Sequence, residues 1–132
     1  MSTALLPGIW EMVRAESGGE PSSDLLALRV ELHLGTETYH VHFAGELADQ
    51  GTYARSPTAA PATLLLLGAQ GPNAGRTIPC IYQLVGDRLR ICYGLDGTTP
   101  PAFATTAGSP HYLATYRRKP KQWVPPFPRL VG

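Results

Sequence analysis

One stretch of the chain, Thr77–Tyr93, constrains the fold most because it has the pattern of a complete β-hairpin. Gly86 and Asp87 at its centre tolerate the positive φ angles that a two-residue hairpin turn needs. With these two residues as the loop, Val85 faces Arg88 across the turn. One face of the hairpin then gathers the apolar side chains and two tyrosines: Cys80, Tyr82, Leu84, Leu89, Ile91 and Tyr93. A slip of one residue would mix this face with the more polar one, so the pattern predicts this register.

A second hairpin is predicted over residues 28–43, where two alternating segments flank the four-residue loop 35–38. Strict alternation of this kind is typical of half-buried strands. The apolar face consists of Val30, Leu32, Leu34, Tyr39, Val41 and Phe43. The polar face consists of Arg29, Glu31, His33, His40 and His42.

The rest of the chain adds short strands and loops and no long helix. Further strands are predicted at 8–15, 51–55, 62–67 and 111–117, and Ser22 or Ser23 can cap one helical turn over 24–27. The segments 68–75 and 94–110 are interpreted as a flexible loop and a weakly structured connection. Asp49, Asp87 and Asp96 are interpreted as turn residues. About eight short strands predict an all-β fold, either an up-and-down barrel or a sandwich.

Composition limits the function classes. The chain has 132 residues, enough for one domain with its own core. Its formal net charge is +1 and no basic stripe is present, so we expect neither a nucleic-acid nor a membrane partner. No signal peptide or transmembrane-length apolar run is apparent, and we expect a cytoplasmic protein. The hairpin register points Cys80 and Cys92 to opposite faces, which argues against a disulfide.

Several motifs resemble those of known small barrels. Gly8-Ile9-Trp10, with Arg117 or Arg118 near the end of the last predicted strand, resembles the lipocalin-like barrels, in which the Trp closes one end and the Arg packs across it. More widely, the chain is similar to a lipocalin-like bacterial domain family of unknown function, of the calycin type and abundant in planctomycetes. The matching segments are 6–10, 28–30, 51–53, Pro61 and its apolar run, 81–93, 101–103 and 116–118. Cys80 stands where that pattern usually has Gly.

The resemblance implies an antiparallel, up-and-down, lipocalin-like barrel of about eight strands over residues 1–118. It implies no chemistry, because the family has no assigned activity. The Pro-rich tail, residues 119–132, lies outside the family pattern.

An eight-stranded barrel encloses just enough room for its own side chains or for one small ligand. The first hypothesis is therefore that the barrel binds a small, mostly apolar molecule, without a cofactor. The predicted ligand-binding residues are Tyr39, Val41, Phe43, Tyr53, Leu64, Leu66, Tyr82, Leu84, Ile91 and Tyr93. The alternative for the same residues is ordinary core packing.

Two other function classes remain open from the sequence. In the first, the barrel is an enzyme, a cyclase or isomerase that encloses an apolar substrate and orients it with tyrosine hydroxyls or Gln83. No nucleophile–base pair stands out in support of it. In the second, the barrel is a ligand-free interaction module whose interior is fully packed and whose tail makes the contacts.

Three histidines are the candidate metal ligands. His33, His40 and His42 project from one face of the second hairpin, with Glu31 opposite His42. Imidazoles at such spacing can bind Zn²⁺ or a similar ion. The alternative is a polar surface that faces solvent, because the other face of the hairpin is the apolar one.

The tail combines four prolines with a strongly apolar content. Proline fixes φ and removes a hydrogen-bond donor, so the segment is predicted to be extended and polyproline-like. A disordered tail or linker, which is the alternative, is normally polar. This one carries Trp123, Val124, Phe127, Leu130 and Val131. We therefore expect it to dock, either on its own barrel or on a second subunit as the clasp of a homodimer.

Overall fold

The computed structural model describes residues 6–108 and 111–119, except for the side chains of residues 24 and 25. This part of the chain forms nine strands in one antiparallel sheet and one short helix, α1 (Ser23–Ala27). The strands are β1 (Gly8–Ser17), β2 (Glu20–Pro21), β3 (Val30–Leu34), β4 (Thr38–Phe43), β5 (Glu46–Ser56), β6 (Ala62–Gln70), β7 (Thr77–Val85), β8 (Arg88–Gly94) and β9 (His111–Arg118).

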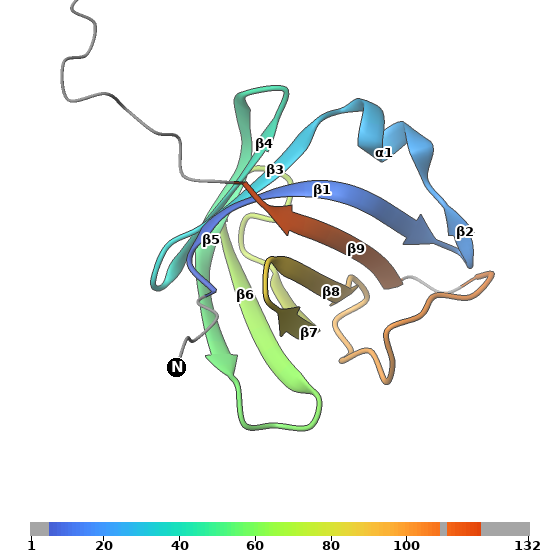
Figure 1. Ribbon diagram of the computed structural model, residues 1–132. Helices are drawn as coiled ribbons and strands as arrows, with labels where there is room; N and C mark the ends of the chain where they lie inside the picture. Colours follow the sequence, from blue (N-terminus) through green and yellow to red (C-terminus); the bar gives the residue numbers. More distant parts are fainter. Residues whose placement is uncertain (1–5, 109–110, 120–132) are drawn as a thin grey trace, which may run out of the picture.

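The sheet closes on itself. Its strands follow the order β2-β1-β3-β4-β5-β6-β7-β8-β9, and β1 also pairs with β9 along most of its length. The two-residue β2 pairs only with β1, so the eight longer strands in the described residues make a closed antiparallel barrel (Figure 1). Consecutive strands are neighbours throughout the barrel, with β1 beside β3 and β9. This confirms the predicted all-β, up-and-down barrel of about eight strands.

Both predicted hairpins have the register that their patterns indicated. Val85 pairs with Arg88 in the β7–β8 hairpin, and His33 pairs with His40 in the β3–β4 hairpin. Cys80 and Cys92 accordingly lie on opposite faces of the sheet, both buried and both with free thiols.

The β4–β5 hairpin was not predicted from the sequence. β5 begins at Glu46 rather than at Gly51, and it pairs with β4 across a tight turn at Ala44 and Gly45. Ala44 has φ +52°, a conformation that alanine seldom adopts and that sequence rules assign to Gly, Asn or Asp.

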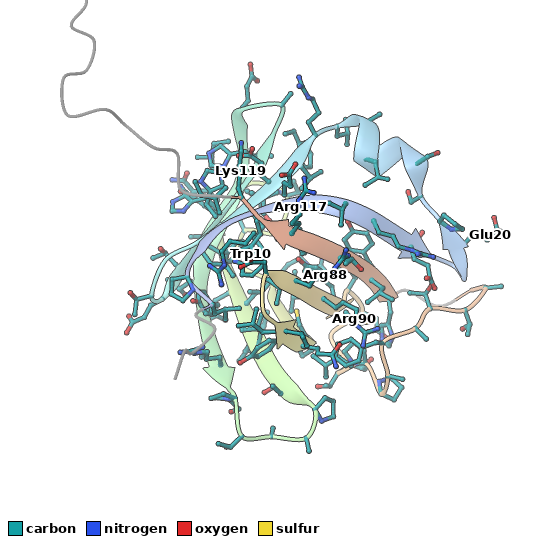
Figure 2. The ribbon with its side chains drawn as sticks, in the orientation of Figure 1. Trp10, Glu20, Arg88, Arg90, Arg117 and Lys119 are labelled. Atoms are coloured by element: carbon teal, nitrogen blue, oxygen red, sulfur yellow. The ribbon has the colours of Figure 1, made fainter. Side chains whose placement is uncertain are left out.

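The end of the barrel near the start of β1 is closed by Trp10. The indole is fully buried, and its Nε1 donates a hydrogen bond to the Leu6 carbonyl oxygen at 2.9 Å. The Arg118 guanidinium lies over the indole, 4.3 Å from the ring centroid, and donates to the Pro7 carbonyl oxygen at 3.0 Å. Arg118 is therefore the arginine that packs across the tryptophan, whereas Arg117 is exposed and pairs with Glu11. Figure 2 shows Trp10 near the end at which Lys119 leaves β9.

A second, smaller core lies outside the barrel wall. Ile81, Cys92 and Leu113 are buried on the outer face of β7–β9, and Phe103 from the β8–β9 connection packs against them. The Arg90 guanidinium lies over the Phe103 ring, 4.4 Å from the ring centroid. The connection therefore covers the sheet, although its sequence indicated a weakly structured segment.

The described chain ends at Lys119. Its backbone N–H donates to the Ile9 carbonyl oxygen, and its Nζ donates to Glu31 Oε2 at 2.6 Å. Residues 120–132, on which the predictions of a docking tail and a homodimer fall, lie outside the described residues. The helical part of the described chain has no segment long and apolar enough to cross a membrane.

Candidate ligand-binding cavity

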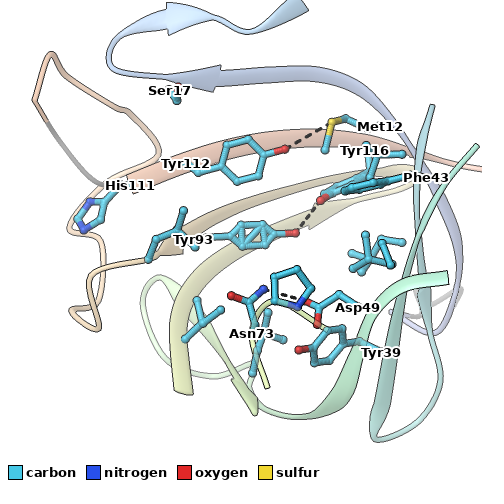
Figure 3. Close-up of a pocket in the computed structure, with 18 residues that line it drawn as sticks. Met12, Ser17, Tyr39, Phe43, Asp49, Asn73, Tyr93, His111, Tyr112 and Tyr116 are labelled. Atoms are coloured by element: carbon cyan, nitrogen blue, oxygen red, sulfur yellow. Dashed lines mark hydrogen bonds between the residues drawn. The ribbon is translucent and has the colours of Figure 1, made fainter. Parts of the chain in front are cut away.

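A cavity of about 570 Å³ lies in the part of the barrel away from Trp10. Its lining includes Ser17 at the end of β1, Phe43 at the end of β4, and Pro72 and Asn73 in the β6–β7 loop (Figure 3). These positions surround the barrel end opposite the tryptophan. The barrel is thus closed and packed at one end and hollow at the other.

Most of the cavity wall is apolar. Aliphatic and thioether side chains reach it from five strands of the barrel. They are Met12, Val30, Leu32, Val41, Leu66 and Ile78. Alternation along each strand explains the set, since every second residue of a barrel strand faces the interior.

Three tyrosines from β8 and β9 form one polar part of the wall. The hydroxyls of Tyr93 and Tyr116 share a hydrogen bond of 2.6 Å, and the Tyr112 ring stacks on Tyr93 with centroids 5.3 Å apart. The Tyr112 hydroxyl donates to the Met12 sulfur. Burial raises the pKa of all three phenols well above the ordinary value. They are therefore neutral hydrogen-bonding groups and poor bases.

The carboxylate of Asp49 forms the other polar part of the cavity wall. Asp49 of β5 is 8% exposed, and its Oδ2 accepts a 2.7 Å hydrogen bond from Asn73 Nδ2 (Figure 3). Its Oδ1 is buried and has no hydrogen-bond partner among the described residues, and the same holds for the hydroxyl of Tyr39, which is 1% exposed. Burial, with the nearby charge of Asp49 as a smaller cause, raises the pKa of Tyr39 to about 12. Unpaired buried polar atoms are rare in folded proteins.

The β6–β7 loop brings Asn73 to the cavity. Gly71 has φ +94°, and a Cβ there would lie 2.5 Å from the Ala48 carbonyl oxygen, so only glycine allows the loop to approach β5 this closely. Arg76 then donates to Asn73 Oδ1 at 3.0 Å and also to the Leu95 carbonyl oxygen. The segment interpreted as a flexible connection is in fact tied to β5 and to the β8–β9 connection.

Half of the predicted ligand-binding residues line the cavity, namely Tyr39, Val41, Phe43, Leu66 and Tyr93. The other half do not line the cavity and only pack within or against the core cluster that contains Trp10, of which Tyr39, Leu66 and Tyr93 are also members. They are Tyr53, Leu64, Tyr82, Leu84 and Ile91. Both sequence alternatives, a cavity and a packed core, are thus present in different parts of one barrel. The Tyr53 hydroxyl, for example, donates to the Gly35 carbonyl oxygen at 2.6 Å.

The sequence analysis missed the polar lining groups on β5, in the β6–β7 loop and on the last strand. Asp49 is a buried strand residue and not a turn residue, and nothing in its local sequence reveals the contact with Asn73. Tyr112 and Tyr116 lie on β9 and alternate with period two, which is the signal that could have placed them. Gln83, expected as an orienting donor, is exposed on the outside of the barrel, where its amide oxygen accepts from Arg90.

The three histidines lie together on β3 and β4, away from the cavity. The rings of His33 and His42 have centroids 4.2 Å apart, those of His40 and His42 are stacked at 6.5 Å, and His33 Nε2 is 2.9 Å from Glu31 Oε1. Burial and the neighbouring histidines lower the pKa of His42. No group of three or more His, Cys, Asp or Glu within residues 6–108 and 111–119 is arranged to hold a metal ion. The structure gives the metal hypothesis no support.

Comparisons of the chain with protein-family models, curated proteins and solved structures found no match. The likeness to the lipocalin-like domain family therefore rests on the sequence segments quoted above. The function has to be argued from the cavity itself.

Proposed function

We propose that the barrel binds a small, mostly apolar molecule in the cavity opposite Trp10. The observation that carries this proposal is the cavity volume of about 570 Å³ behind an apolar and aromatic wall. Small-molecule sites commonly fall in this size range and combine such walls with a few polar groups. Protein interiors are otherwise close-packed, so a hollow of this size at one end of a barrel suits an occupant. The resemblance to lipocalin-like barrels supports the same function.

The cavity bears differently on the two alternative functions, the ligand-free interaction module and the enzyme. A ligand-free module was expected to have a fully packed interior, and the barrel does not have one. An enzyme would use the same cavity, with the neutral tyrosine hydroxyls as orienting donors, and that hypothesis stays a prediction. Binding requires the fewest further assumptions.

A fluorescence titration with a neutral apolar probe, N-phenyl-1-naphthylamine, tests the proposal. We expect a saturable rise in fluorescence with the purified protein. Val41→Phe, on the cavity wall, should weaken probe binding by about tenfold or more because the added ring occupies the space of the probe. Leu65→Phe is the matched control, since Leu65 lies on the neighbouring surface of β6 and is 40% exposed.

Thermal unfolding of both variants shows whether the fold is retained. A wild-type protein that gives no saturable signal contradicts the proposal. So does equal probe affinity in the two variants, because it would place the probe on the surface of the barrel.

A further inference from the structure

The cavity has one polar feature that its apolar wall does not explain. The Asp49 carboxylate is almost completely buried, and only its Oδ2 is paired, by Asn73. Burying a carboxylate oxygen without a hydrogen-bond donor is costly, because the lost hydration is not replaced. The buried hydroxyl of Tyr39, which also lines the cavity, is unpaired as well among the described residues. None of the described residues supplies a donor to Asp49 Oδ1.

The charges around the cavity indicate which kind of donor fits. None of the described residues that line it is Lys or Arg, so no lining cation neutralises Asp49. His111 lies on the wall, but its Nε2 is 3.3 Å from the Asp96 carboxylate, which offsets any positive charge there. Arg76 reaches the amide oxygen of Asn73 from the exposed side of the loop, where water screens its charge. The potential inside the cavity is therefore negative near Asp49.

We propose that the ligand is an apolar amine whose ammonium group pairs with the Asp49 carboxylate while its hydrocarbon body lies along the aliphatic and tyrosine walls. This step rests on the proposed binding function and specifies its ligand class. The ammonium supplies both the missing donor and the missing countercharge, and charge-assisted hydrogen bonds are stronger than neutral ones.

Other head groups satisfy fewer of these conditions. An alcohol supplies a donor but leaves the charge of Asp49 uncompensated. A carboxylate supplies neither and is repelled by Asp49 in an apolar surrounding. A ligand without any polar group leaves Asp49 Oδ1 without a donor. The order of affinity expected from the structure is amine first, then alcohol, then acid.

Displacement of N-phenyl-1-naphthylamine by three ligands of equal chain length tests this order. We use decylamine, decanol and decanoate at concentrations below micelle formation. Decylamine should displace the probe at a concentration roughly tenfold or more below that needed for decanol, the size expected for a hydrogen bond to a charged group. Decanoate should be the weakest of the three.

Asp49→Asn assigns the effect to the carboxylate. In this variant decylamine and decanol should displace the probe at equal concentrations, whatever the affinity of the variant for the probe itself. Glu46→Gln is the matched control, because it removes one negative charge from an exposed residue at the start of the same strand, outside the cavity lining, and it should retain the preference.

The wild-type protein also gives a test that needs no variant, in case Asp49→Asn fails to fold. Nuclear Overhauser contacts should join the methylene beside the ammonium of decylamine to the Asp49 β protons. Contacts there from the terminal methyl group instead would overturn the proposal.

The outcomes separate the two levels of inference. If the probe binds and the three head groups displace it equally, or decanoate displaces it best, the amine proposal is wrong and the binding function stands. A decylamine preference unchanged in Asp49→Asn also overturns the amine proposal. If neither the probe nor decylamine binds the wild-type protein, both proposals fail.

Discussion

At the scale of single residues, Trp10 contributes most visibly to the fold, because it fills the closed end of the barrel beneath Arg118. Trp10→Ala should lower the free energy of unfolding by about 3–5 kcal/mol, as expected for a large core truncation. Trp10→Phe keeps an aromatic ring but leaves the Leu6 carbonyl oxygen without its donor, and should cost about 1–3 kcal/mol. Urea denaturation measures both. Ile9→Ala is the control, since Ile9 is 39% exposed beside it. Equal losses in Trp10→Ala and Ile9→Ala would contradict the placement.

The same scale shows where sequence reasoning works and where it does not. The resemblance to lipocalin-like barrels placed Trp10 at one end and narrowed its arginine to Arg117 or Arg118, because both ends of that motif are visible in the chain. The role of Asp49 was not found, because it depends on Asn73, which lies 24 residues further along and reaches β5 only through the close approach of Gly71. Local patterns carry no information about such contacts.

At the scale of elements, the β8–β9 connection is fixed to the barrel through Thr105. Its hydroxyl donates to Glu16 at 2.9 Å and accepts from the Gly19 backbone N–H at 2.8 Å, and the side chain is buried. Thr105→Val should therefore cost about 1–3 kcal/mol, because the Gly19 amide loses its acceptor. Hydrogen exchange of that amide should accelerate in the variant.

Thr106→Val is the control for this prediction, because Thr106 is the exposed neighbour in the same connection. Faster exchange in the control as well, or an unchanged rate in Thr105→Val, would show that the connection is not held by this hydroxyl.

The elements themselves divide into predictable and unpredictable ones for a physical reason. Alternation fixes which face of a strand is buried, so the registers of both predicted hairpins followed from the sequence. The β4–β5 turn and the packing of Phe103 did not follow. Ala44 adopts a positive φ against its own preference, and Phe103 is placed by Arg90 and by the outer face of another hairpin.

At the scale of the whole molecule, the prediction that the Pro-rich tail docks on a barrel can be tested by removing the tail. Its composition predicts docking, and burial of Trp123 and Phe127 would contribute about 1.5–3 kcal/mol each. We expect a chain shortened to end at Lys119 to unfold at a lower temperature. Gel filtration of the shortened chain distinguishes docking on the same barrel, which leaves the size class unchanged, from exchange between two subunits. Gln122→Ala in the full chain is the control. Unchanged thermal stability together with unchanged size would refute docking.

The barrel should also lose stability in alkali. Burial is the main cause that raises the pKa of five tyrosines above the ordinary value of 10, and they are Tyr39, Tyr53, Tyr93, Tyr112 and Tyr116. In the unfolded chain these phenols ionise near pH 10, whereas in the folded barrel they keep their protons. The unfolded state therefore binds fewer protons above pH 10. Stability is complete below that pH and falls as the pH rises through the folded values, that of Tyr39 being about 12.

Replacing Tyr93 and Tyr116, whose hydroxyls share a hydrogen bond, measures their part of this loss of stability in alkali. Replacing both by Phe removes a donor and its acceptor together, so the cost at neutral pH should be small. Above pH 10 the double variant should lose stability less steeply than the wild type, by about 2.7 kcal/mol per pH unit for two such protons. Urea denaturation from about pH 8 to about pH 11 measures both slopes. Parallel slopes would mean that the two phenols ionise as readily in the barrel as in water, which contradicts their burial in the cavity wall.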